Sequence, residues 1–438
     1  MRSFVLVAVV LALVCQDSLF AAQAQLNVAI GQPTLIADKK QTAFVKVALT
    51  GFAIENPAER TPVNVALVLD RSGSMQGPKL EHAKIGAISA LERLGPNDIV
   101  SVIVFDDTVN VLVPATKLTD KASVRAAIER IQAGGSTALF AGVSKGAEEV
   151  RKFIDRNRVN RVILLTDGIA NVGPSSTAEL GSLGASLKKE GIAVSTLGLG
   201  DDYNEDLLYA LAARSDGNHA FIKKPGDLAR IFNCEFGEVL TVVGQEVSVK
   251  IQCAEGIRPV RALGREADIS GQTVYAQLNQ LYANQEKYIM LEVEIPATEN
   301  GKTREIATVN VSYSNTVTKT TDKLSSTVSA SFSNVASAVD RDEIKKVMVD
   351  AVLLVGTDNN SRAMVLRDQG NIKAAKEVFL DNNVYLSGNA SRYKSKDLEN
   401  YWNFNNGNLK GIEDNDEWNK TRKDIQDEGF KHRQQRGF

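Results

Sequence analysis

Segments with the pattern of buried strands alternate with segments of helical pattern through the middle of the chain. Val63 to Leu69 is an almost continuous apolar run, as expected of a strand that is covered on both faces. Similar runs follow at residues 99–105, 162–165 and 192–197. The segments of helical periodicity between and after them are 78–94, 121–132, 138–153, 176–190 and 204–214. This alternation predicts an α/β domain with a doubly wound, mostly parallel sheet and helices on both faces.

The pattern on either side of this domain is that of antiparallel β structure. Residues 26–60 alternate apolar and polar positions and end in a Pro- and Glu-containing linker, which predicts two strands. After a helix at about 226–242, alternating strands recur at 246–252, 287–295 and 305–313. We expect the N-terminal strands to complete this second unit, so that the α/β domain is an insertion in a β-sandwich.

The C-terminal part has the pattern of a helical hairpin followed by a polar tail. Apolar residues from Ile344 to Val355 form one helix face, and Gly356 is predicted to end that helix before a second one continues to residue 382. The hairpin resembles half of a tetratricopeptide array, but one hairpin is too short for a solenoid. Beyond residue 382 the chain is rich in Asn, Asp, Lys and Arg, which is typical of disorder. The aromatic residues of this tail leave docking on the body open as an alternative; they are Tyr401, Trp402, Phe404 and Trp418.

The first residues have the pattern of a cleavable export signal. Arg2 precedes an apolar run from Phe4 to Val14, and Ala22-Gln23-Ala24 offers small residues where a signal peptidase cleaves, which places cleavage before Gln25. The run is shorter than the ~20 residues that span a bilayer, and no other stretch is long enough. We therefore expect a secreted or periplasmic protein with no transmembrane segment after cleavage.

The three cysteines fit this prediction in different ways. Cys15 could be the lipidated cysteine of a lipoprotein, which is an alternative to cleavage before Gln25, although Val14 is bulkier than such a site normally accepts. After signal cleavage Cys234 and Cys253 remain, in a compartment where a disulfide could form. Because one lies on a helix and the other at the far end of the next strand, their Cα atoms are expected to lie too far apart, and we predict no disulfide.

Composition agrees with several folded units and excludes some partners. A chain of 438 residues that is 43% hydrophobic is long enough for about three units with cores. A formal net charge of -2 gives no reason to propose nucleic acid or an anionic membrane as the partner. The predicted organisation is a signal peptide at 1–24, N-terminal sandwich strands at 25–60, the α/β domain at 61–242, the remaining β-sandwich at 243–333, the helical hairpin at 334–382 and a mostly disordered tail at 383–438.

Oxygen-bearing side chains follow the buried strands at the points where these end. Asp70, Ser72 and Ser74 come directly after the first strand, Thr137 precedes a helix, and Asp167 follows the strand at 162–165. The carboxyl ends of parallel strands meet at one sheet edge, so these five side chains are expected to converge there. Two carboxylates and three hydroxyls suit a hard cation, Mg²⁺ or Mn²⁺, whereas zinc or copper would require His or Cys. Two aspartates only balance a doubly charged ion, so an outside carboxylate can still complete its shell.

The same residues carry a family resemblance. Asp70-Arg71-Ser72-Gly73-Ser74, Thr137 and Leu165-Thr166-Asp167-Gly168 resemble the metal-ion-dependent adhesion site of von Willebrand factor type A domains, over about residues 61–242. The resemblance implies that Ser72 and Ser74 bind the metal directly, that Thr137 binds it directly or through water, and that Asp70 and Asp167 act largely through water. The layout is also similar to bacterial exported members of the family and, loosely, to inter-alpha-trypsin inhibitor heavy chains. What the resemblance implies is a binding protein, not an enzyme, which captures a protein ligand through an Asp or Glu of that ligand.

Three other interpretations compete with this one. Asp70 and Ser72 could merely cap the next helix, but capping explains one or two of the five residues. A haloacid dehalogenase-type phosphatase would use Asp70, Thr137 and Gly200-Asp201-Asp202, yet Ser72 stands where that class has its general acid, and a hydroxyl cannot protonate a leaving group at neutral pH. The third is a structural module whose metal site is vestigial and whose sandwich or tail does the binding.

Overall fold

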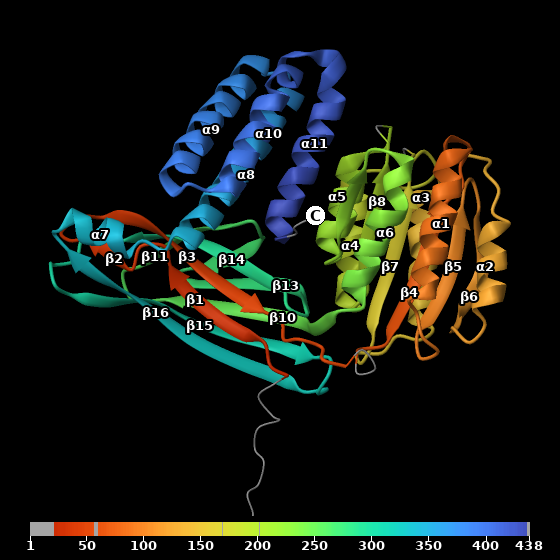
Figure 1. The fold of residues 1–438 in the computed structure, drawn as a ribbon, viewed down its shortest axis with the longest axis horizontal. Helices are drawn as coiled ribbons and strands as arrows, with labels where there is room; N and C mark the ends of the chain where they lie inside the picture. Colours follow the sequence, from red (N-terminus) through yellow and green to blue (C-terminus); the bar gives the residue numbers. More distant parts are fainter. Residues whose placement is uncertain (1–21, 57–59, 169, 201, 436–438) are drawn as a thin grey trace, which may run out of the picture.

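The computed structural model describes residues 22–56, 60–168, 170–200 and 202–435, and these form three packed parts (Figure 1). An α/β domain lies at one end, a two-sheet β structure lies at the other, and the C-terminal helices pack over the latter and reach across to the former. The predicted export signal lies outside the described residues, apart from Ala22 to Ala24 at its end. Its cleavage therefore stays a prediction.

The α/β domain is built on one six-stranded sheet with the order β6-β5-β4-β7-β8-β9. The strands are β4 (Val63–Asp70), β5 (Ile99–Phe105), β6 (Val109–Lys117), β7 (Val159–Thr166), β8 (Ala193–Leu199) and β9 (His219–Ile222). All neighbours pair in parallel except β6, an antiparallel edge strand next to β5 that the sequence analysis missed. In β6 only Val113 is buried and the other positions are intermediate or exposed, so the strand lacks the continuous apolar run of its neighbours.

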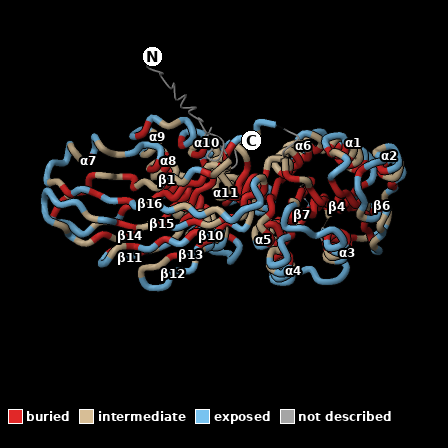
Figure 2. The backbone as a smooth tube through the Cα atoms, turned by 90° about the horizontal axis from the view of Figure 1, so that it is seen from below, coloured by how far each residue is buried: buried red, intermediate tan, exposed pale blue. Residues whose placement is uncertain are grey.

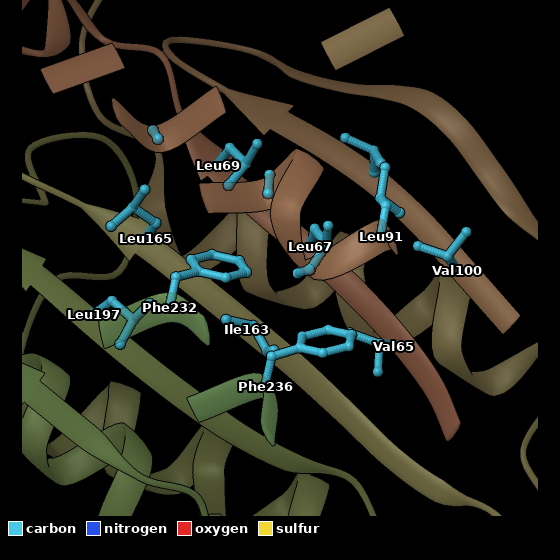
Figure 3. Packing of buried hydrophobic residues seen from close by; sticks show 14 of the residues in the cluster. Val65, Leu67, Leu69, Leu91, Val100, Ile163, Leu165, Leu197, Phe232 and Phe236 are labelled. Atoms are coloured by element: carbon cyan, nitrogen blue, oxygen red, sulfur yellow. The ribbon is translucent and has the colours of Figure 1, made fainter. Parts of the chain in front are cut away.

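Helices cover both faces of this sheet, as predicted. One face is covered by α1 (Pro78–Glu92), α2 (Lys121–Glu129) and α6 (Leu228–Val239), and the other by α3 (Leu139–Arg151), α4 (Thr177–Lys189) and α5 (Glu205–Arg214). Successive residues of β4 point to opposite faces. Val65 and Leu67 pack with Phe232 and Phe236 of α6 (Figure 3), whereas Val68 belongs to the core under α3 to α5. Apolar cores cover both faces of the sheet and hold it rigidly, so a polar functional site can form only at the ends of its strands.

The second part is a β-sandwich, and the N-terminal strands complete it as predicted. One sheet contains β1 (Gln25–Ile30), β3 (Gln41–Thr50), β14 (Glu286–Ile295) and β11 (Arg258–Leu263). The other contains β12 (Ala267–Ser270), β13 (Thr273–Tyr282), β10 (Val242–Cys253), β15 (Thr303–Asn315), β16 (Thr321–Ser333) and β2 (Thr34–Ile36). β3 pairs with β14 along ten residues, and the inner faces of both sheets share one apolar core. The α/β domain is therefore an insertion in the sandwich.

The predicted disordered tail is wrong, because the chain is helical to Gln434. After the short α7 (Ala336–Asp342) come four long helices, α8 (Lys345–Asp368), α9 (Ile372–Tyr393), α10 (Lys396–Glu413) and α11 (Asn415–Gln434). They pack in sequence, and α11 returns to contact α8 (Figure 1). Gly356 does not end a helix. It lies inside α8, where an added Cβ would come within 2.9 Å of Leu386 Cδ2 and 3.1 Å of Tyr401 Cε1, so the glycine permits close helix packing.

Buried polar contacts explain why amino-acid composition wrongly predicted disorder for residues 383–438. Asn360, Asn382 and Asn405 are each at most 3% exposed, and their side-chain amides hydrogen-bond to one another across α8, α9 and α10 at 2.8 to 3.1 Å. Satisfied amides of this kind specify helix register in a core that has few aliphatic residues. Hydrophobic content alone therefore underestimated how much of the tail is buried (Figure 2).

The last helix joins the C-terminal helices to the α/β domain. Lys423 and Arg422 of α11 form ion pairs with Glu205 at 2.6 and 2.7 Å, in the first turn of α5. Phe430 packs edge-on against the rings of Tyr209 and His219. Because Lys423 is 3% and Glu205 6% exposed, this pair is desolvated and leaving either partner alone would be costly. The C-terminal helices therefore hold the α/β domain at α5.

A buried network fixes the α/β domain on the sandwich. The Arg161 guanidinium, at the start of β7, is fully buried and donates to Glu235 of α6 at 3.0 Å and to Gln280 of β13. Ser195 and Asn218 donate to the same Glu235 carboxylate. These contacts lie at the amino ends of the parallel strands, opposite the edge where the predicted site lies. They therefore hold the domain without obstructing that edge.

No helix in the described part of the chain is long and apolar enough to cross a membrane. The two cysteines of that part are both free. Cys253 is 2% exposed in the sandwich core, and burial raises the pKa of its thiol to about 11, whereas Cys234 on α6 is partly exposed.

We predict different reactivities for these two thiols. A maleimide at pH 8 should modify Cys234 of the native protein and modify Cys253 only after denaturation, because a buried thiol of raised pKa is neither accessible nor ionised. Peptide mass spectrometry of reduced and non-reduced samples measures this. A quantitative Cys234–Cys253 cross-linked peptide in the non-reduced sample would contradict both the prediction and the free thiols.

The C-terminal helices should lose stability in acid. The pKa of His432 is lowered from 6.5 to about 4, chiefly because the imidazole is buried and in part because the charges of Arg433 and Lys431 lie nearby. The unfolded chain takes up this proton at higher pH than the folded chain does, so the free energy of unfolding should fall as the pH drops from about 6.5 to about 4.

Tryptophan fluorescence measures this, because both tryptophans, Trp402 and Trp418, lie in α10 and α11. The His432→Asn variant, which keeps a polar group facing Thr357, should flatten the urea midpoint over this pH range, and His82→Asn should not. Equal slopes for the wild type and His432→Asn would refute the assignment.

Candidate functional site

The predicted site lies at the carboxyl edge of the parallel sheet, where three loops meet. β4 ends at Asp70 and β7 ends at Thr166, and the third loop leads into α3. Backbone hydrogen bonds tie the first and third loops together. Gly73 N–H donates to the Gly135 carbonyl at 3.0 Å, and Gly134 N–H donates to the Arg71 carbonyl at 2.8 Å. The edge is therefore one preformed surface, not three independent loops.

The first loop folds its three oxygen side chains back toward β7. The Asp70 carboxylate accepts from Ser72 N–H at 2.7 Å, which bends the chain directly after the strand. A short 3₁₀ turn, Gly73–Met75, then places the Ser74 hydroxyl 3.1 Å from that of Ser72. Alternate residues of this loop thus present their oxygens on the same side.

The second loop brings the other carboxylate to the same point. Ser74 Oγ donates to Asp167 Oδ1 at 2.7 Å, and Thr166 Oγ1 donates to Asp70 Oδ2 at 2.5 Å. Asp70 and Asp167 are both 0% exposed. Two carboxylates held this deeply, each of which accepts a hydrogen bond from a hydroxyl, form an oxygen-lined site.

Thr137 completes the set from the third loop. Its backbone N–H donates to Asn171 Oδ1 at 2.8 Å, so the loop after β7 holds it in place. A Cβ on Gly168 would lie 2.9 Å from Thr137 Oγ1 and 3.6 Å from Asp70 Oδ2, so both oxygens come close to the backbone there. Only a glycine permits this approach. All five predicted residues are therefore brought together.

Burial dominates the electrostatics of this site. The pKa of Asp70 is raised to about 6, chiefly because burial desolvates its carboxylate; hydrogen bonds from Thr166 and Ser72 reduce this shift, and the nearby Asp167 charge contributes to it. A carboxylate whose charged form is disfavoured in this way is stabilised by a positive charge beside it. The site is thus suited to a cation.

The structure adds two basic residues that the sequence analysis did not assign. Arg71 pairs with Asp106 at 2.6 Å and so links the first loop to the turn after β5. Lys79, in the first turn of α1, forms an ion pair with Asp167. The only signal for Lys79 in the sequence is a basic residue at a helix start, where the helix dipole disfavours it.

The donor set fits a hard divalent cation. It consists of carboxylate and hydroxyl oxygens, which Mg²⁺ and Mn²⁺ accept, and contains neither His nor Cys. Within the described ranges, no group of three or more His, Cys, Asp and Glu is arranged to hold a metal. The candidate set is of a different kind, because only two of its five residues are carboxylates. The described residues therefore contain no His, Cys, Asp and Glu cluster that competes with it as a metal site.

Residues 64–233 match the von Willebrand factor type A domain family. With its doubly wound sheet and the loop constellation at its edge, the chain therefore contains a von Willebrand factor type A (VWA) domain. Domains of this family commonly mediate interactions between proteins and often bind a divalent metal at the corresponding edge.

Curated relatives match part of the chain. The uncharacterized protein sll0103 of Synechocystis is 31% identical over 61% of this chain and 65% of that protein. The uncharacterized protein YfbK of Escherichia coli is 26% identical over 49% of this chain and 37% of that protein. Human inter-alpha-trypsin inhibitor heavy chain H3 is 30% identical over 37% of this chain and 19% of that protein. The chain thus spans less than two thirds of the length of each.

Two solved structures share the fold of nearly the whole chain. A von Willebrand factor type A protein from Catenulispora acidiphila has a TM-score of 0.68 at 15% identity, covering 90% of both chains. The ArnB paralog VWA2 from Sulfolobus acidocaldarius has a TM-score of 0.62 at 15% identity, covering 94% of this chain and 99% of that one. The combination of sandwich, inserted VWA domain and C-terminal helices is therefore a recurring architecture.

Proposed function

We propose that this protein is an exported binding protein that captures a protein partner through a divalent cation, Mg²⁺ or Mn²⁺, held by Asp70, Ser72, Ser74, Thr137 and Asp167. The observation that carries the proposal is the convergence of these five side chains from three loops on one point of the sheet edge. When bound, the cation would supply a Lewis-acidic position for an outside ligand.

Charge balance indicates what that ligand is. The five residues supply two negative charges, enough to neutralise the ion but not to exclude another anion. An Asp or Glu of the partner would complete the metal shell, and the partner's carboxylate would bind chiefly through the ion. Ser74 and Gly73 are exposed, so the site is accessible from solvent at this edge.

Binding, and not hydrolysis, agrees best with the residues around the site. The phosphatase hypothesis needs an acid two residues after Asp70, where Ser72 stands with its hydroxyl next to that of Ser74. In the segment after β8, from which that hypothesis takes Gly200-Asp201-Asp202, Asn204 caps α5 by accepting from the Asp206 and Leu207 amides and so has a structural role. Asp201 lies outside the described residues.

The hypothesis of a vestigial metal site with a binding tail loses one of its supports. The aromatic residues that the tail offered for binding lie in the clusters among α8 to α11, with Tyr401 2% exposed. They stabilise the C-terminal helices. The exposed edge with its buried carboxylates is then the best candidate for partner capture.

Calorimetric titration tests the metal site directly. The wild type should bind one Mg²⁺ or Mn²⁺ per chain, Asp70→Ala should bind none, and Ser72→Ala should bind with reduced affinity, because it loses one neutral ligand. Ser325→Ala, at an exposed sandwich position, is the matched control and should bind as the wild type does. The fold should persist in all variants, because the site lies outside the apolar cores.

Partner capture is tested by a pull-down from the native source with Mg²⁺ and again with EDTA. We expect the partner to be retained only with Mg²⁺ and to be lost with Asp70→Ala. Capture that is unchanged by EDTA, or a wild type that binds neither ion at millimolar concentration, would overturn the proposed function.

A further inference from the structure

Lys79 lies against one of the two buried carboxylates of the metal site, that of Asp167. Its Nζ donates to Asp167 Oδ2, while the other oxygen of the same carboxylate accepts from Ser74 at 2.7 Å. Asp167 is 0% exposed, and a buried carboxylate without a counter-charge is strongly unfavourable. Lys79 therefore supplies, from within the chain, the charge that Asp167 requires.

The position of Lys79 is not explained by its own helix. It follows Pro78 in the first turn of α1, where the helix dipole favours acidic side chains and disfavours basic ones. The N-cap is Gly77, which makes no side-chain cap hydrogen bond. A lysine placed against local preference, with its ammonium directed to a residue 88 positions away, indicates a role at the site.

No other described ion pair involves a candidate ligand. Arg71, the other basic residue at this edge, is held by Asp106 at 2.6 Å. The Lys79 side chain is 25% exposed, so its ammonium has access to solvent if it leaves Asp167. The buried carboxylate of Asp167 is thus paired with a cation that is itself partly exposed.

We propose that Lys79 is a built-in counter-ion of the metal site, which neutralises Asp167 in the metal-free protein and is displaced when a divalent cation binds. The inference rests on the proposed function and adds its regulation. Metal affinity is then set by competition, because the ion must replace an existing ion pair and not merely fill an open site. The Lys79–Asp167 ion pair stabilises the edge of the sheet in the absence of metal. It also raises the cation concentration that is needed before the site can bind a partner.

Chemical labelling tests the displacement in the unaltered protein. Acetylation of Lys79 by an N-hydroxysuccinimide ester, quantified by peptide mass spectrometry, should be slow without metal and should rise several-fold with saturating Mg²⁺. Lys84, which lies on the same helix and pairs with Glu81 at 2.9 Å, is the internal control and should not change. Equal labelling of Lys79 in both conditions, in a protein that calorimetry shows to bind Mg²⁺, would overturn the inference.

Substitution tests the competition. Lys79→Met should lower the thermal midpoint of the metal-free protein and raise its Mg²⁺ affinity by about tenfold. Lys79→Gln, which can still donate a hydrogen bond to Asp167, should also raise affinity and serves if the Met variant fails to fold. Lys79→Arg keeps the charge and Lys84→Met lies off the site, so both should bind Mg²⁺ as the wild type does.

The outcomes separate this inference from the proposed function. If the wild type binds Mg²⁺ and Lys79→Met and Lys79→Gln bind it equally well or more weakly, the ion pair is only structural and the inference fails alone. If neither the wild type nor any variant binds Mg²⁺, both fail. If only the uncharged variants bind, Lys79 blocks the metal instead of being displaced by it, so the displacement and metal-dependent capture by the wild type are both refuted.

Discussion

The burial of two like charges at the edge of a parallel sheet is the constraint on which the rest of the site depends. Asp70 ends β4, Asp167 directly follows the neighbouring strand β7, and neither is exposed to solvent. Hydroxyls of Ser74 and Thr166 satisfy part of their hydrogen-bonding capacity, but only a positive charge offsets the loss of hydration. Lys79 supplies one such charge within the chain, and a divalent cation would supply a stronger one.

The surrounding architecture keeps this edge open while fixing the domain elsewhere. The Arg161 network attaches the opposite end of the sheet to the sandwich, and α11 attaches the flank at α5 through Glu205. Both attachments use desolvated charges, which tolerate little displacement. A partner bound at the metal site would therefore transmit force to the sandwich and to the C-terminal helices, which is compatible with the proposed capture function.

The sequence predicted the elements whose hydrophobic pattern is strong and the site whose residues are adjacent to them. Val63 to Leu69 has the pattern of a buried strand, so Asp70 was expected at its carboxyl edge, and Asp167 was expected there by the same rule after the strand at 162–165. Lys79 was missed because its partner is 88 residues away. The tail was misjudged because Asn360, Asn382 and Asn405 are buried by pairing with one another, which composition cannot show.

A crystal structure of the wild-type protein soaked with Mn²⁺ tests the central claim most directly, because the ion is visible by its anomalous scattering. The account predicts one strong anomalous peak at the sheet edge, among the oxygens of Asp70, Ser72, Ser74, Thr137 and Asp167, with the Lys79 ammonium moved away from Asp167. A map with no peak at that edge at millimolar Mn²⁺, with Lys79 still paired to Asp167, would contradict it.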